Sequence, residues 1–201
     1  MKKIRRFTLI ELLAVMAIIA ILSGIGFGAY TYANNKAKES STEALMKQIE
    51  AGLESFHTKN GYYPRSNSGF SAITFTLAAD GTVSAVNFGS TELTKVSAPT
   101  TRAARLNNEL FESFTKVLDL EVIKKSLNDS HQLEDAWGGV IYYRAPGLFN
   151  TGSFDLISAG PDGGFSSDTP PAANMTGFTA DDRGKFREDD GTHLCDDLFN
   201  F

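Results

Sequence analysis

A single carboxylate, Glu11, interrupts an otherwise apolar run near the start of the chain. Between Phe7 and Tyr30, Glu11 is the only side chain that is charged at neutral pH. A charged side chain at the centre of a membrane costs roughly 2.5–3.5 kcal/mol on insertion scales, and acids found there usually have a function. The chemistry that Glu11 offers is therefore charge pairing with a cation inside an apolar layer.

A helix must position this carboxylate. The 24 residues from Phe7 to Tyr30 form a continuous apolar segment apart from Glu11. As an α-helix this segment would extend about 36 Å, which is enough to cross a bilayer. The segment follows a cluster of basic residues: Lys2, Lys3, Arg5 and Arg6. Basic flanks stay on the cytoplasmic side of membranes, so we expect a cytoplasmic N-terminus and an exported remainder of the chain.

Two simpler interpretations compete with a functional membrane helix. A secretory signal peptide has an apolar core of about 7–15 residues followed by a small-residue cleavage site. The apolar run here is longer, although Thr31-Tyr32-Ala33 could serve as such a site. A plain membrane anchor would span the bilayer equally well, but it gives Glu11 no role.

The string from Phe7 to Leu13, Phe-Thr-Leu-Ile-Glu-Leu-Leu after a short basic leader, resembles the N-terminal motif of type IV pilin-like proteins. In that family a prepilin peptidase cleaves before the Phe and methylates the new amine. The acid four residues later then neutralises the N-terminus of a neighbouring subunit as a filament grows from the membrane. The resemblance implies processing between Arg6 and Phe7 and an assembly role for Glu11. Its implied partners are the prepilin peptidase, inner-membrane secretion or pilus assembly machinery, and further copies of this chain.

Arg6 departs from the Gly that the family usually has before the cleavage point. Cleavage would create a positive amine within the apolar layer, and Glu11 would supply the opposite charge. If the leader is retained, Arg5 or Arg6 reaches Glu11 only by bending back, and a filament contact would be organised differently. Cleavage and retention both stay open at the level of the sequence.

Three regions follow from these patterns. Residues 1–6 form the basic leader, residues 7–60 form one long helix with its membrane or filament part at 7–30, and residues 61–201 form a globular extracytoplasmic domain with an extended C-terminal loop. The helix carries apolar residues at helical spacing on one face beyond the membrane: Leu45, Ile49, Leu53 and Phe56. That face should pack on the domain. Asn60-Gly61 should end the helix, because Gly is the usual residue just past a C-terminus.

The globular part reads as a small antiparallel β structure with one helix. Alternating apolar and polar residues predict a hairpin from segments 72–77 and 82–88, and a second hairpin from segments 140–143 and 153–157. Apolar residues at helical spacing predict a helix over 102–120. The expected fold class is α+β, with the long helix packed on a small antiparallel sheet in a pilin-like arrangement.

A second resemblance rests on three segments in order: Asn60 to Pro64, Asp135 to Gly139, and Ser158 to Gly163. This order is similar to the major pseudopilin of type II secretion systems, whose C-terminal loop holds a calcium ion. The resemblance implies a calcium site with the Ala159 carbonyl, Asp162, and Asp196 or Asp197 as ligands. Calcium prefers such oxygen ligands. Relatives join the two parts of the site by a short loop, whereas residues 164–195 intervene here, so an acidic solvated loop is the alternative.

Composition narrows the remaining function classes. The formal charge is −5, and loss of the basic leader makes it more negative, which does not favour binding to nucleic acid. Cys195 is the single cysteine, so no intrachain disulfide can form. The three histidines have no metal-ligand spacing, and no phosphate-binding glycine loop is present, so the sequence predicts no enzymatic activity.

The leading hypothesis is a structural subunit of a pilin-like filament, the pseudopilus of type II secretion, in the bacterial inner membrane before assembly. A type IV pilin or minor pilin for adhesion or DNA uptake is an alternative within the same family. A non-polymerising, single-pass anchored domain that binds calcium or another ligand outside the membrane is an alternative of a different class.

Overall fold

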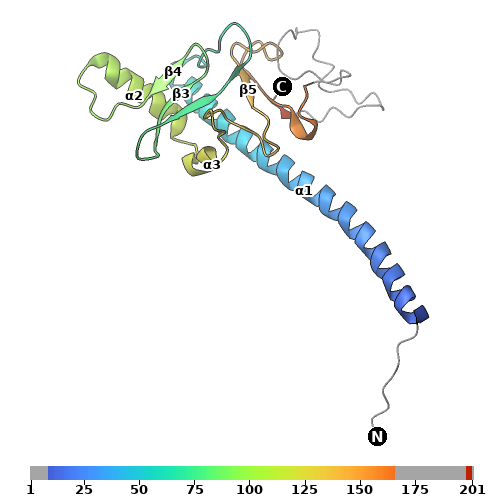
Figure 1. Cartoon of the computed structure of the whole chain (residues 1–201). Helices are drawn as coiled ribbons and strands as arrows, with labels where there is room; N and C mark the ends of the chain where they lie inside the picture. Colours follow the sequence, from blue (N-terminus) through green and yellow to red (C-terminus); the bar gives the residue numbers. More distant parts are fainter. Residues whose placement is uncertain (1–8, 166–197, 201) are drawn as a thin grey trace. The chain divides into compact units, whose positions relative to one another are not determined.

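The computed structural model describes residues 9–165 and 198–200 (Figure 1), with the side chains of residues 24–27, 162 and 199 left aside. The chain divides into two compact units, Met1–Lys38 and Glu39–Phe201. The long helix α1 (Leu9–Asn60) begins in the first unit and ends in the second. Each unit is described by itself below.

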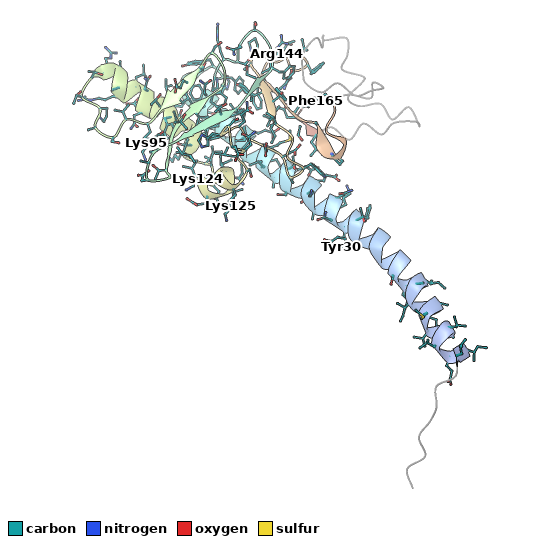
Figure 2. The ribbon with its side chains drawn as sticks, viewed as in Figure 1. Tyr30, Lys95, Lys124, Lys125, Arg144 and Phe165 are labelled. Atoms are coloured by element: carbon teal, nitrogen blue, oxygen red, sulfur yellow. The ribbon has the colours of Figure 1, made fainter. Side chains whose placement is uncertain are left out.

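The first unit is the apolar part of α1. The helix continues without a break through Gly24, Gly26 and Gly28. The side chains that are described between Leu9 and Ala37 are exposed, as the labelled Tyr30 illustrates in Figure 2. By length and composition, α1 contains a segment able to cross a membrane. The predicted membrane helix is therefore present as a helix.

In the second unit, the remainder of α1 forms one wall of the core. The predicted face is buried: Leu45 is 5% exposed, and Ile49, Leu53 and Phe56 are fully buried. The helix ends where Asn60-Gly61 predicted. Gly61 takes the left-handed conformation with φ 77°, and its N–H donates to the His57 carbonyl at 2.7 Å.

Two antiparallel sheets form the rest of the second unit's β structure. The three-stranded sheet has the order β2 (Thr74–Leu77), β3 (Val83–Asn87) and β4 (Glu92–Thr94). The four-stranded sheet has the order β1 (Ser71–Ala72), β5 (Tyr142–Arg144), β6 (Asp155–Ser158) and β7 (Leu198–Phe199). The β2–β3 and β5–β6 pairs confirm both predicted hairpins, whereas two sheets replace the single sheet that we expected.

The helix predicted over 102–120 is present but ends five residues early. Helix α2 (Arg102–Thr115) ends early, and α3 (Leu120–Lys125) begins after Asp119. Asp119 caps α3, because its carboxylate accepts the N–H groups of Glu121 at 3.1 Å and Val122 at 3.3 Å. Thr101 caps α2 in the same way through the N–H of Ala104. Capping by Asp119 therefore starts a new helix at the end of the range that was predicted as one helix.

The core has a main part and a smaller one. In the main part, the fully buried Tyr143 donates its hydroxyl proton to the Pro64 carbonyl at 2.7 Å, and Phe114 packs edge-on against Phe88. The smaller apolar cluster lies on the opposite face of β5 and β6 and includes Phe165, which is labelled in Figure 2. The α+β class with a long helix packed on small antiparallel sheets is confirmed.

Candidate functional site

Glu11 lies in the first turn of α1, on an exposed part of the helix. Four unsatisfied N–H groups and the helix dipole make the start of a helix a favourable place for an acid. Arg6 and Phe7, the two residues at the expected cleavage point, lie outside the described residues. Pairing between Glu11 and an amine at Phe7 therefore stays a prediction.

The surface around Glu11 is apolar on every side of the helix. Ten large apolar side chains between Leu9 and Leu22 are each at least 50% exposed. Full burial of one such side chain is worth about 1.5–3 kcal/mol, so water is a poor environment for this segment. A helix that is apolar all round requires lipid or other helices around it.

Two of the expected metal ligands, Ala159 and Asp162, lie at the two ends of a short turn, η1 (Gly160–Asp162), that follows β6. Ala159 occupies the position before this turn and is 2% exposed. Asp162 is the last residue of η1. Asp196 and Asp197 lie outside the described residues, but Leu198, the next residue along the chain, pairs with Ser158 in the β6–β7 ladder.

The C-terminal strand is fastened to β6 by side-chain contacts as well as by the ladder. The side-chain amide of Asn200 bonds to the backbone at the start of β6. Its Oδ1 accepts the Leu156 N–H at 2.7 Å, and its Nδ2 donates to the Phe154 carbonyl at 3.3 Å. The β6–β7 ladder and the Asn200 amide together hold the register that places Leu198 opposite Ser158.

Two features of the described residues bear on the expected calcium site. Within residues 9–165 and 198–200, no group of three or more His, Cys, Asp or Glu side chains is arranged to hold a metal. The four candidates supply only carbonyl and carboxylate oxygens, which is the donor chemistry of calcium. The β6–β7 register also brings the chain next to Asp197 back to the residue before Ala159. The candidates fit calcium in these two respects, and binding itself stays a prediction.

The buried carboxylate of Asp135 connects the segment Asp135–Gly139 to β6. Its Oδ1 accepts the N–H groups of Trp137 and Gly139, both at 2.8 Å. Its Oδ2 accepts the Ser158 hydroxyl proton at 2.6 Å. Asp135 is 7% exposed and Ser158 is fully buried. Charge-assisted hydrogen bonds of this length are roughly twice as strong as neutral ones.

A second buried carboxylate, Asp155, holds the loop between β5 and β6. It is fully buried and accepts the N–H groups of Leu148, Phe149 and Asn150, the last two at 2.8 Å. These bonds satisfy the charge without a cation. Sequence reasoning included Asp135 only as part of a resemblance segment, and it gave neither carboxylate a structural role. An acid inside an otherwise apolar strand was the available signal for Asp155.

Polar aromatic contacts fix the turn that follows α1. Tyr63 donates its hydroxyl proton to Glu54 at 2.8 Å, and its ring stacks on His57 with centroids 4.3 Å apart. Burial raises the pKa of Tyr63, and the bond to Glu54 acts in the same direction. Burial also raises the pKa of Glu50 on α1, against an opposing effect of Lys47.

Comparison with known proteins bears on the N-terminal motif first. The family model described as the prokaryotic N-terminal methylation motif matches residues 1–27. The chain carries the methylation motif of prepilin-type proteins. The matched range contains Phe7 to Leu13, the string on which the first resemblance rested, and also Arg6, the departure from the usual Gly.

The second comparison covers most of the chain. Type II secretion system core protein G of Escherichia coli (strain K12) is 26% identical over 163 residues, which is 80% of this chain and 84% of that relative. No solved structure matches the chain significantly. The predicted similarity to type IV pilin-like proteins, and to the major pseudopilin of type II secretion in particular, is confirmed.

Proposed function

We propose that this chain is a structural subunit of a pilin-like filament that supports protein secretion, of the type II pseudopilus kind. The methylation motif and the similarity to a type II secretion core protein over most of the chain support this function. The role is architectural rather than catalytic. Before assembly, the apolar part of α1 anchors the subunit in the inner membrane with its N-terminus in the cytoplasm.

The observation that carries the proposal is the combination of one acid with an unpartnered apolar helix surface. Ten exposed apolar side chains between Leu9 and Leu22 can pack laterally on equivalent helices of other subunits once they leave the lipid. This packing is non-directional, so it does not by itself set how far one helix slides along the next. A charge pair can set that register.

Glu11 would form this pair with the N-terminal amine of a neighbour. Cleavage by the prepilin peptidase after Arg6 makes Phe7 the first residue, and its methylated amine remains a cation. At about 4 Å separation and an effective dielectric constant of about 20, the two unit charges attract by about 4 kcal/mol. Each charge also removes the cost of leaving the other unpaired in an apolar layer.

We also propose that the turn η1 and the C-terminal strand bind calcium through the Ala159 carbonyl, Asp162, and Asp196 or Asp197. The bound ion would neutralise the carboxylates and tie the C-terminal end to β6. The oxygen-only donor set and the pairing of Leu198 with Ser158 support this site.

Exchange of Glu11 tests the filament function. We expect Glu11→Leu and Glu11→Gln to insert in the membrane at wild-type level but to lower the amount of chain in filaments at least tenfold. Val15→Ile, an apolar exchange in the same segment, is the control and should assemble normally. The measurement is the amount of chain in sheared filaments relative to the membrane fraction.

Three outcomes would count against the proposal in different ways. Normal assembly of Glu11→Leu would show that charge pairing does not set the register. Absence of any polymer from the wild-type chain, with its machinery present, would favour the anchored ligand-binding domain. Filaments that form but support adhesion or DNA uptake instead of secretion would favour a type IV pilin or minor pilin.

A further inference from the structure

Two tyrosines, Tyr30 and Tyr32, lie at the end of the apolar part of α1. Tyr30 is 70% exposed and Tyr32 is 69% exposed, whereas the tyrosines of the second unit are more buried, from Tyr62 at 49% to the fully buried Tyr143. Figure 2 labels Tyr30 on this part of the helix. Aromatic rings carry a large apolar surface, so two rings this exposed require an environment other than water alone.

The chemistry of tyrosine suits the boundary between lipid tails and headgroups. Its ring is apolar and its hydroxyl is polar, and membrane proteins concentrate tyrosine at this boundary. The sequence around the two tyrosines changes in the same direction. Residues 12–29 include no charged side chain, and Asn34, Asn35 and Lys36 follow Ala33. The rings can therefore stay with the lipid tails while their hydroxyls meet the headgroups.

The distance between Glu11 and Tyr30 matches the thickness of the hydrocarbon layer. On the continuous helix α1, the rise from Glu11 to Tyr30 is about 28 Å. The hydrocarbon core of a bilayer is about 30 Å thick. When Tyr30 lies at one boundary of the core, Glu11 therefore lies at the other, where water and headgroups solvate its charge.

The two rings project from nearly opposite sides of α1. At about 100° per residue, positions two apart differ by about 200° around the helix axis. One neighbouring helix lies along a single side of α1, so it covers at most one of the rings. A lipid–water interface surrounds the helix and accommodates both. The arrangement therefore favours a lipid surface over a single protein partner.

We propose that Tyr30 and Tyr32 form an aromatic belt that binds the phospholipid headgroup region on the exported side of the membrane and fixes the depth of α1. The belt holds Glu11 at the opposite boundary, so every subunit that awaits assembly presents Glu11 at the same level. This inference rests on the membrane anchoring within the proposed function, and it does not require polymerisation.

Tyr30→Leu/Tyr32→Leu is the sharpest test, because it keeps the segment apolar and removes both amphipathic rings. The apolar run then extends to Ala33, and we expect α1 to slide toward the cytoplasmic side by about 3–6 Å, the rise of two to four residues. Tyr30→Trp/Tyr32→Trp keeps amphipathic rings and should keep the wild-type depth. Tyr62→Leu exchanges an exposed tyrosine of the second unit and is the matched control.

The measurement is the depth of nitroxide labels on the full-length chain in vesicles of phosphatidylethanolamine and phosphatidylglycerol. Depth is obtained from label collisions with oxygen, which enters lipid, and with a nickel complex, which stays in water. Cys195 is the single cysteine, so Cys195→Ser precedes Ala14→Cys or Ala33→Cys, which place one label each. In the leucine variant, we expect the label at 33 to enter the lipid and the label at 14 to approach the opposite headgroups by the same distance. In the tryptophan variant and in Tyr62→Leu, both labels should keep the wild-type depth.

The outcomes separate this inference from the proposed function. Unchanged depth of both labels in the leucine variant would overturn the belt, and loss of filaments at unchanged depth would assign the rings to packing between subunits. A change at position 33 alone would mean that α1 tilts, and would overturn the control of Glu11. A wild-type chain that does not insert would overturn the anchoring and the belt together. Absence of polymer from the wild-type chain would count against the filament function alone, because the vesicles contain no assembly machinery.

Discussion

Exchange of Gly52 for Ala on α1 should destabilise the chain, although the same exchange normally stabilises a helix. Gly in a helix interior is less favourable than Ala by about 1 kcal/mol. Against this gain, a Cβ at Gly52 would lie 2.9 Å from Phe114 Cε2 and 3.0 Å from the Phe114 carbonyl oxygen. Carbon atoms in contact are normally about 3.5–4.0 Å apart. A Cβ at Gly52 would therefore clash with both the ring and the backbone of Phe114 on α2.

The surroundings of Phe114 do not allow easy relaxation. The ring is fully buried and packs edge-on against Phe88 with centroids 5.1 Å apart, and the carbonyl oxygen belongs to the backbone of α2. Overpacking of a well-packed core costs about 1–3 kcal/mol. Because neither the ring nor the backbone carbonyl has room to move, the upper part of this range applies, about 2–3 kcal/mol. After subtraction of the helix gain of about 1 kcal/mol, we expect Gly52→Ala to lower the free energy of unfolding by about 1–2 kcal/mol.

The assay is denaturant unfolding of the full-length chain in detergent, followed by circular dichroism. Gly69→Ala is the control, because nothing lies within 4 Å of a Cβ at that position. It should change the free energy of unfolding by no more than about 0.5 kcal/mol. A Gly52→Ala chain as stable as wild type, or more stable, would refute the steric reasoning and show that α2 can shift away from α1.

Two further exchanges test polar groups of the second unit. Tyr143→Phe removes the buried hydroxyl that donates to the Pro64 carbonyl, and it should lower the unfolding free energy by about 1–3 kcal/mol. Tyr142→Phe, on the other face of β5, is the control and should be nearly neutral. Equal effects of the two exchanges in urea unfolding would contradict the role given to the Tyr143 hydroxyl. Burial raises the pKa of Glu50 above its ordinary value of 4.5, so the folded chain holds that proton more tightly and ionisation opposes folding as the pH rises through this range. The Glu50→Gln chain should therefore be more stable than wild type between pH 4 and 7. The gain in unfolding free energy should have the size that is usual for a substitution at a partly buried position. A loss of stability in thermal melting over the same pH interval would refute the sign.

The parts of the fold that follow from local patterns could be predicted from the sequence. The buried face of α1 follows from the spacing of Leu45, Ile49, Leu53 and Phe56, and its end follows from Gly61, whose positive φ few other residues accept. The β2–β3 and β5–β6 hairpins join segments that are close in sequence, so alternation and turn residues were enough.

The parts that depend on contacts between distant residues could not be predicted. The β6–β7 pair joins residues about forty positions apart, and β4 is too short to show alternation. The boundary between α2 and α3 depends on the cap at Asp119, which helical periodicity does not report. At the candidate site, resemblance gave the expected calcium ligands, which stay a prediction, but it did not give the Asp135–Ser158 bond, which joins positions 23 residues apart.

The central claim, that a processed N-terminus and Glu11 build a filament, is tested most directly by the mass of the N-terminal peptide. The peptide is taken from the chain isolated from its native membrane. We predict a peptide that begins at Phe7 with a methylated amine, in spite of Arg6 at the position where relatives have Gly. A peptide that begins at Met1 would contradict processing and would leave Glu11 without the amine that the account requires.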